Sequence, residues 1–217
     1  MTERMSAHRA DLFHPDTWPA GFRYAPDFLD TAEEERLIRA VEPLAFAPFE
    51  FQGFVGNRRV ISFGWRYDFN GGGLQQAEDI PAFLLPLRKA AGGLFGIDPA
   101  KLEQVLLTQY PPGAAIGWHK DRSVFEDVIG VSLLSSCTFR FRRKAGAKWE
   151  RCALVVEARS AYLLQGEART AWQHSIPAVE SLRYSITFRS FRAVARASDP
   201  GRRKSRSRDP RDRATQE

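Results

Sequence analysis

Arg183-Tyr-Ser-Ile-Thr-Phe-Arg189 is a stretch near the C-terminus in which polar and apolar residues alternate strictly. Successive side chains of a β-strand point to opposite faces, so this stretch predicts a strand with two different faces. One face carries Arg183, Ser185, Thr187 and Arg189, and the other carries Tyr184, Ile186 and Phe188. We expect the apolar face to pack outward or against a second sheet, and the polar, cationic face to line a ligand cavity. The alternative is a solvated sheet edge that carries arginines.

Three candidate metal ligands precede this strand. His119 and Asp121 are two residues apart, and His174 follows 53 residues after Asp121. Two imidazoles and one carboxylate can bind one face of a metal ion and leave its other positions open, as in non-haem Fe(II) oxygenases. Residues two apart on a strand share a face, so we expect His119 and Asp121 to reach the metal from one segment. His174 is expected on the opposite wall of a barrel. The alternative is a surface His-x-Asp sequence with an unrelated core histidine.

The two arginines of the strand follow His174 by nine and fifteen residues. At roughly 3.3 Å per residue they are about 20 Å apart along the strand, so they cannot hold the same carboxylate. We expect one to hold the distal carboxylate of 2-oxoglutarate by a bidentate fork, and the other to lie nearer the metal or the substrate. The triad and the arginine pair together predict iron with 2-oxoglutarate.

Short β-strands separated by turn signals dominate the chain after about residue 100. We predict strands over Arg58–Phe63, Val105–Tyr110, Val128–Leu134, Thr138–Arg143, Ala153–Val156, Tyr162–Leu164, Ala171–Ile176 and Leu182–Phe191. A loop is predicted over Asn70–Gly73. Many short strands with little helix between them indicate a sandwich or a barrel.

Two helices are predicted in the N-terminal part. Asp30 or Thr31 can cap a helix over residues 31–43, with Glu34 placed three residues after Thr31 as in a capping box. A second helix is expected within residues 81–94, ended by a cluster of glycines.

Length and composition indicate one folded domain. With 217 residues, of which 43% are hydrophobic, the chain can bury one substantial core. We find no sequence typical of a membrane span or signal peptide and only two cysteines, so a cytoplasmic protein is expected. We predict a flexible arm over residues 1–20, the folded domain over 21–192 and a disordered basic tail over 193–217. Eight basic and four acidic residues give this tail +4 of the net charge of +6.

Further motifs surround the candidate ligands. They are Gln109-Tyr-Pro-Pro-Gly113, Gly166-Glu-Ala-Arg169 and His174-Ser-Ile-Pro177. With the triad and the arginine strand, they make the chain resemble the AlkB family of Fe(II)/2-oxoglutarate dioxygenases over about residues 58–192. The resemblance implies a mostly β (α+β) fold with a double-stranded β-helix, or jelly-roll, core over about residues 100–192. It also implies N-terminal helices and a substrate lid over about residues 46–73.

The resemblance also implies a role for each site residue, with O2 as the oxidant. The iron ligands would be His119, Asp121 and His174. Arg183 would bind the distal carboxylate of 2-oxoglutarate, assisted by the hydroxyl of Tyr110, and Arg189 would lie near the metal-proximal carboxylate. Thr108 and Ser185 stand where DNA-repair members commonly have asparagine, so we expect hydroxyl donors in the cofactor site.

The segment from Asn57 to Phe69 is the candidate lid because it interleaves aromatic residues with arginines. An enzyme that works on a base takes it out of its stack and holds it between flat side chains. Aromatic and cationic side chains together also suit single-stranded nucleic acid. We therefore expect substrate contacts from Trp65, Tyr67 and Arg59, although these aromatics could instead pack a strand onto a helix. Trp172 is predicted either to wall the pocket or to belong to the core.

These inferences favour oxidative dealkylation of alkylated bases in DNA or RNA. An N-alkyl carbon would be hydroxylated, and the hemiaminal would release an aldehyde and restore the base. A second hypothesis keeps the oxygenase but gives it a protein side chain or a small molecule as substrate, and a third is a non-catalytic jelly-roll binding module. A monomer without membrane attachment is expected. The basic tail either adds phosphate contacts or only improves solubility.

Overall fold

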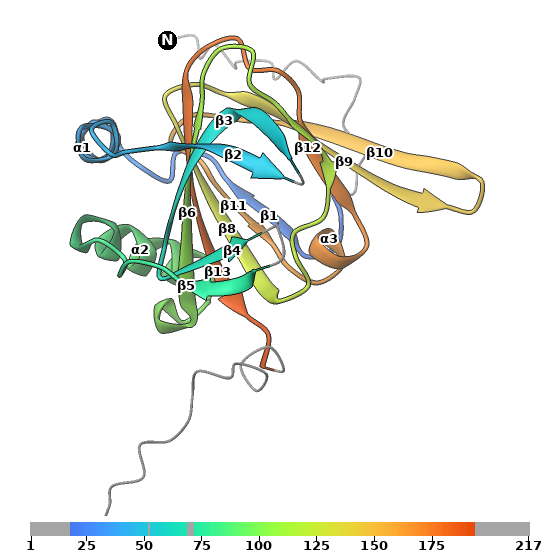
Figure 1. Ribbon diagram of the computed structural model, residues 1–217. Helices are drawn as coiled ribbons and strands as arrows, with labels where there is room; N and C mark the ends of the chain where they lie inside the picture. Colours follow the sequence, from blue (N-terminus) through green and yellow to red (C-terminus); the bar gives the residue numbers. More distant parts are fainter. Residues whose placement is uncertain (1–17, 52, 69–71, 194–217) are drawn as a thin grey trace, which may run out of the picture.

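The computed structural model describes residues 18–51, 53–68 and 72–193, and most of its strands belong to two antiparallel sheets (Figure 1). The large sheet has the order β1 (Phe22–Ala25), β11 (Ala161–Leu164), β8 (Phe125–Leu133), β13 (Arg183–Phe191), β6 (Leu102–Tyr110), β3 (Phe54–Phe63) and β2 (Ala47–Phe51). The small sheet has the order β10 (Lys148–Val156), β9 (Cys137–Ala145), β12 (Gln173–Ile176) and β7 (Ile116–His119). A separate hairpin pairs β4 (Trp65–Asp68) with β5 (Gly73–Gln76).

The chain from β6 to β13 passes between the two sheets in the manner of a jelly roll. Strands β6, β8, β11 and β13 lie in the large sheet, and β7, β9, β10 and β12 lie in the small sheet. This confirms the predicted fold class. The lid region expected over about residues 46–73 forms β2, β3 and the strand β4, and β2 and β3 extend one edge of the large sheet.

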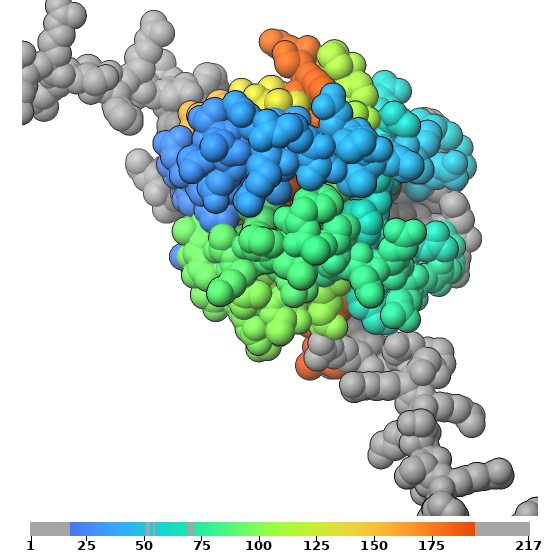
Figure 2. Space-filling model, turned by 90° about the vertical axis from the view of Figure 1, so that its left-hand side faces the viewer, coloured from blue at the N-terminus to red at the C-terminus, as the bar shows by residue number. Residues whose placement is uncertain are grey.

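Two helices cover the outer face of the large sheet. They are α1 (Thr31–Val41) and α2 (Leu85–Phe95), which Figure 2 shows in blue and green on one side of the molecule. The remaining helical segments are short: η1 (Ala82–Leu84), η2 (Pro99–Lys101) and α3 (Gly166–Thr170). The apolar residues of β13, Tyr184, Ile186 and Phe188, belong to the same buried cluster as Leu37 of α1 and Leu87 of α2. The apolar face of β13 therefore packs outward, beneath the helices.

A second buried cluster lies on the inner side of the small sheet. It includes Phe139 and Phe141 of β9, Leu154 of β10 and Tyr162 of β11. Burying a large apolar side chain contributes about 1.5–3 kcal/mol, so this cluster holds the two sheets together. The polar face of β13 points toward this cluster, and its arginines consequently lie in the interior of the protein.

Several local predictions were wrong at the level of single residues. Asp30, one of the two predicted caps, begins α1, but the acid of its capping box is Glu33 and not Glu34, because the Asp30 carboxylate accepts from the Glu33 N–H at 2.7 Å. The second helix ends at the predicted glycine cluster, but it passes its first two glycines and continues to Phe95, one residue beyond the predicted range, before Gly96 adopts a left-handed φ of 73°. The segment predicted as a strand from Ala171 begins only at Gln173, after the short helix α3.

Strands β1, β2, β4, β5 and β7 were not predicted from the sequence. All five have only four or five residues, and β7 (Ile-Gly-Trp-His) also contains a glycine that breaks its apolar pattern. Such short strands are recognised only through their partners in the sheet. The predicted arm up to residue 17, the tail after residue 193 and the loop residues 69–71 lie outside the described residues.

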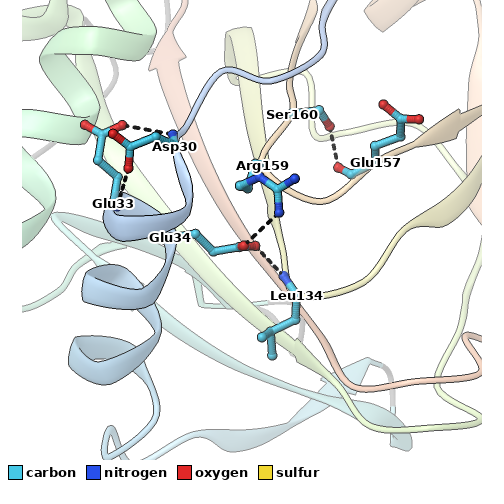
Figure 3. Close-up of polar contacts among 7 residues, drawn as sticks. All are labelled: Asp30, Glu33, Glu34, Leu134, Glu157, Arg159 and Ser160. Carbon is cyan, nitrogen blue, oxygen red and sulfur yellow. Dashed lines mark hydrogen bonds and ion pairs between the residues drawn. The ribbon is translucent and has the colours of Figure 1, made fainter.

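Glu34 anchors α1 to the jelly roll (Figure 3). Its side chain is largely buried and accepts the Leu134 N–H at 2.8 Å and a guanidinium N–H of Arg159 at 3.3 Å. Leu134 and Arg159 have left-handed φ angles of 72° and 62°, so both turns adopt a backbone conformation that side chains disfavour. Glu34, which the sequence predicted to be part of the helix cap, therefore forms a contact between α1 and the jelly roll instead.

Replacing Glu34 with alanine is expected to destabilise the protein by about 1–3 kcal/mol, because the part-buried Leu134 N–H loses its acceptor and Arg159 loses its ion pair. The measurement is the free energy of unfolding from urea denaturation. Glu35→Ala is the matched control, since Glu35 lies on the exposed side of the same helix and forms only a surface ion pair with Arg39. Equal stability of the two variants would contradict the assigned anchor.

Candidate metal and 2-oxoglutarate site

The structure brings His119, Asp121 and His174 together. One potential ligand atom from each lies within 4.8 Å of the others. His119 ends β7 and His174 lies on β12, and the two residues are direct partners in the small sheet. The prediction that they reach the metal from opposite walls was therefore wrong. Asp121 follows β7 in a loop, so the position of its side chain is set by that loop and not by strand alternation.

The backbone next to His119 orients its imidazole ring. Nδ1 of His119 lies 2.9 Å from the carbonyl oxygen of Gly117. Because a carbonyl oxygen can only accept, Nδ1 carries the hydrogen, and the lone pair of Nε2 is left for a metal. Metal-binding histidines commonly have such a partner on the other ring nitrogen. The sequence could not identify this partner.

Asp121 is held as a carboxylate by its surroundings. Burial by itself raises its pKa, but electrostatic interactions, the largest of them with the Arg189 guanidinium and smaller ones with the two imidazoles, outweigh burial and lower the pKa to about 2. An Nη group of Arg189 lies 3.3 Å from the carboxylate, and a second Nη group donates to Gln104 at 2.9 Å. Arg189 therefore lies beside the candidate metal ligands, at the end of β13 where it was expected.

His174 is held in the neutral form that a metal requires. Burial is the main cause that lowers its pKa, to about 3, with smaller contributions in the same direction from the interactions with His119 and Arg189 and an opposing one from Asp121. Its ring stacks on Phe139 at a centroid distance of 5.3 Å and an interplanar angle of 14°. Asp121 and His174 thus already have the protonation states for metal binding at neutral pH.

Arg183 is a completely buried cation that needs an anionic partner. It is 0% exposed, and Nε donates to the Ser132 hydroxyl at 3.1 Å. Among the described residues, neither Nη1 nor Nη2 has a hydrogen-bond partner, although both are buried. A buried charge with unpaired donors is costly, so this guanidinium is suited to a carboxylate ligand that binds through two parallel bonds. The observation fits the distal carboxylate of 2-oxoglutarate.

Hydroxyl groups line the polar face of β13 between the two arginines. Ser185 pairs with Thr108 of β6, and Arg183 pairs with Tyr110, so all four lie on the inner face of the large sheet. The ring of Tyr110 lies 5.0 Å from the Arg183 guanidinium carbon. Burial raises the pKa of Tyr110, which keeps its hydroxyl protonated and able to donate a hydrogen bond. Each residue predicted for the cofactor site thus faces the same interior space.

Tyr162 is a site residue that the sequence analysis missed. It lies on β11 opposite Gly130 of β8, and a Cβ added to Gly130 would lie only 2.1 Å from the tyrosine ring. Burial raises the pKa of Tyr162, and the charge of Arg183 acts on the same hydroxyl in the opposite direction. A glycine within an otherwise apolar strand was the available signal, because it marks a close approach by another group.

Arg58, and not Arg59, is the lid arginine that faces the site. Val60 pairs with the inward-facing Thr108, so Arg58, two residues earlier, has the same orientation. Burial lowers the pKa of Arg58, as does the charge of Arg189, with Tyr110 opposing them. Arg59 points to the helix side, where it donates to the Phe46 carbonyl at 2.6 Å. The predicted substrate contact from Arg59 was therefore wrong by one residue, because the sequence does not specify which face of this strand points toward the site.

The other predicted substrate residues have different surroundings. The guanidinium of Arg122, next to Asp121, lies 4.7 Å from the centre of the Tyr67 ring, which places Tyr67 beside the metal residues. Trp65 packs edge-on against Phe191 at a centroid distance of 5.8 Å. These contacts place part of the hairpin that includes β4 next to the ligand-bearing loop.

Trp172 belongs to the buried cluster between the sheets, as one of its two predicted roles required. Its ring is edge-on to Phe141 at 6.5 Å, and the Arg143 guanidinium lies 4.8 Å from the ring centre. It also lines a surface cavity of about 440 Å³ together with Trp18 and Arg143. None of the three candidate metal ligands lines this cavity.

Comparison with known proteins supports the chemistry inferred from these residues. The sequence profile of the 2OG-Fe(II) oxygenase superfamily matches residues 21–189. The chain is 29% identical over 202 residues to an Arabidopsis thaliana protein named "Alkylated DNA repair protein ALKBH8 homolog", a match that covers 81% of this chain and 56% of the relative. It is also 29% identical over 155 residues to "Alpha-ketoglutarate-dependent dioxygenase alkB homolog 7, mitochondrial" of Bos taurus, covering 70% of this chain and 65% of that protein.

Two solved structures have a similar fold. "The structure of OsALKBH1" superimposes with a TM-score of 0.61 at 17% identity, covering 80% of this chain and 98% of the other. A 2OG-Fe(II) oxygenase family oxidoreductase from Burkholderia pseudomallei superimposes with a TM-score of 0.54 at 14% identity, covering 79% and 85% of the two chains. The chain belongs to the 2OG-Fe(II) oxygenase superfamily and is an AlkB-like member of it.

The enzymes of this superfamily use Fe(II), 2-oxoglutarate and O2, which confirms the predicted cofactors. The chain spans between about half and two thirds of the length of the curated relatives it matches, with 56% and 65% of the two described above. Within the described residues, no helix has the length and apolar character needed to cross a membrane.

Proposed function

We propose that this oxygenase removes alkyl groups from nucleic-acid bases by oxidation. The observation that carries the proposal is the pair formed by Tyr67 and Arg122 next to Asp121, with the guanidinium 4.7 Å from the ring centre. A flat aromatic ring with a cation over it, directly beside the metal residues, suits an extruded base that has to be stacked and held. The name of the Arabidopsis thaliana relative, an alkylated DNA repair protein, supports the same class of substrate.

The residues of this chain position and protect the reaction. His119, Asp121 and His174 would hold the iron, and Arg183 would hold the distal carboxylate of 2-oxoglutarate. With its cofactors bound, such a site supplies the hydroxylation of a carbon–hydrogen bond while 2-oxoglutarate is converted to succinate and CO2. Burial of Asp121, His174 and Arg183 excludes water from the space between them and strengthens the electrostatic contacts that fix their orientation.

The product follows from the chemistry of the alkylated nitrogen. Hydroxylation of an N-methyl carbon gives a hemiaminal, in which the carbon carries both the base nitrogen and a hydroxyl group. The carbon–nitrogen bond then breaks, the hydroxyl proton is transferred to the nitrogen, and formaldehyde is released. The base is restored without cleavage of the nucleic-acid chain.

A substrate panel tests this proposal. Iron-loaded full-length protein is incubated with 2-oxoglutarate and with N-methylated single-stranded DNA, RNA, tRNA or peptides, and formaldehyde and succinate are both measured. Release of the two products in equal amounts with at least one methylated nucleic acid is the expected result, and Asp121→Ala provides the inactive control. If a peptide or small molecule is hydroxylated while every methylated nucleic acid is unchanged, the chain is a hydroxylase of another substrate class.

A further inference from the structure

We propose that the outward face of the small sheet binds a single strand of nucleic acid, on the side of that sheet opposite the candidate metal ligands. This proposal rests on the proposed function for its choice of partner. The outer arginine–tryptophan face is formed by Trp118, Arg140, Arg142, Lys144, Trp149 and Arg151. These residues come from β7, β9 and β10, and no part of the reaction described above uses them.

Strand alternation sets the orientation of these side chains. Phe139 and Phe141 of β9 are buried between the sheets, so Arg140, Arg142 and Lys144 point to the opposite side. Arg151 of β10 pairs with Arg142, and Trp149 pairs with Lys144, which places them on the same outward face. On β7, His119 points inward to the metal residues, and the neighbouring Trp118 points outward. The outer face and the candidate metal site thus lie on opposite sides of the small sheet, and β7 contributes a side chain to each.

The arginines of this face are already held in position. The Arg142 guanidinium carbon lies 4.5 Å from the ring centre of Trp118 and 4.5 Å from that of Trp149, so this cation is shared by two indoles. Its Nε donates to Gln173 at 2.7 Å, and Nε of Arg140 donates to Ser175 at 3.0 Å. These bonds fix both guanidiniums without using their Nη groups. A phosphate can therefore be bound with little loss of side-chain freedom.

The charge on this face is of one sign. Its outward positions carry Arg140, Arg142, Lys144 and Arg151, while the remaining outward positions of the four strands, within the part of the chain described, are apolar or neutral polar. The acid of the hairpin, Glu150, pairs with Arg143 on the opposite side. An unbalanced row of cations is the electrostatic complement of a phosphate backbone.

The indoles favour nucleic acid over an acidic peptide as the ligand. Trp149 is a large apolar side chain that remains 40% exposed, and it stands beside the stacked Arg142. Flat rings interleaved with cations are suited to alternate bases and phosphates, because every base has a face that stacks. A carboxylate-rich peptide has no group that would use the exposed ring in this way.

The first test measures the salt dependence of binding. A fluorescent, unmethylated single-stranded oligonucleotide is titrated with full-length protein and with the double variant Arg142→Ala, Arg151→Ala at several salt concentrations. Removing two phosphate contacts is expected to reduce the slope of log K against log salt by about 1.4. The control is Arg36→Ala, Arg39→Ala on the exposed side of α1, which removes the same charge far from this face and should leave the slope unchanged. Equal slopes for the two double variants would overturn the proposal, as would failure of the parent protein to bind.

The second test separates stacking from general attraction of anions. Trp149→Ala is expected to weaken oligonucleotide binding about 5- to 150-fold, with a smaller effect on inorganic polyphosphate, which has no bases. An equal effect on both ligands would contradict a stacking surface. Because these ligands are not substrates, the outcome is independent of dealkylation. If the protein binds oligonucleotides through this face but dealkylates no nucleic acid, the binding surface is confirmed and the proposed function is wrong. If it dealkylates nucleic acid but the variants of this face bind normally, the proposed function is confirmed and the binding surface is wrong.

Discussion

Asp121→Ala is expected to abolish iron-dependent turnover of 2-oxoglutarate. The variant removes the single carboxylate from a set of three ligand atoms that lie within 4.8 Å of one another, and two imidazoles alone leave the metal weakly held. It also leaves Arg189 without the carboxylate that lies 3.3 Å from its guanidinium, which adds an uncompensated buried charge to the site. His119→Ala and His174→Ala are expected to have the same effect on turnover.

Metal binding gives a readout that does not depend on catalysis. The thermal stability of the parent protein should rise on addition of Mn(II), because an ion that binds only the folded state stabilises it, by about 2.7 kcal/mol at one hundred times its dissociation constant. The Asp121 and His174 variants should show no such rise. Asp79→Ala, at an exposed aspartate, is the control and should behave as the parent. Full activity in any of the three ligand variants would falsify the assigned metal site.

Arg183→Lys is expected to raise the KM for 2-oxoglutarate by about 10- to 100-fold. The two Nη groups of Arg183 are buried and have no hydrogen-bond partner among the described residues, so both are available to the carboxylate. A lysine keeps the charge but replaces the planar fork by a single ammonium group, so at least one charge-assisted bond of about 1.5–3 kcal/mol is lost. The measurement is succinate formation at varied 2-oxoglutarate and saturating substrate.

Two further variants locate the effect of Arg183 in the cofactor pocket. Ser132→Ala removes the hydroxyl that accepts from Nε of Arg183 at 3.1 Å, so it should raise the same KM by a smaller factor. Tyr110→Phe should cost about one hydrogen bond, or roughly 0.5–1.5 kcal/mol. If Arg183→Lys leaves the dependence on 2-oxoglutarate unchanged while the protein remains folded, the distal carboxylate is bound elsewhere.

The sequence by itself determined the chemistry of the site and the class of the fold. The alternation from Arg183 to Arg189 predicted a strand with one polar face, and that face lies in the interior beside the metal residues. The ligand set could be identified because the donor types and spacing of His119, Asp121 and His174 restrict the possible metals. Alternation and ligand chemistry are local properties, so they could be identified before any strand partner was known.

Only the tertiary structure decided which strands are neighbours and which side chains face the site. His119 and His174 proved to be partners in one sheet, which no pattern within either segment specifies. Of the adjacent residues Arg58 and Arg59, only one can face the site, because successive side chains of a strand point to opposite faces. Which one does so is set by the register of β3 with β6. Glu34 is an anchor, and not a cap, because Leu134 and Arg159 reach it from distant turns. Each of these features depends on contacts between segments far apart in the chain, where the register of one sheet fixes the environment of every side chain on it.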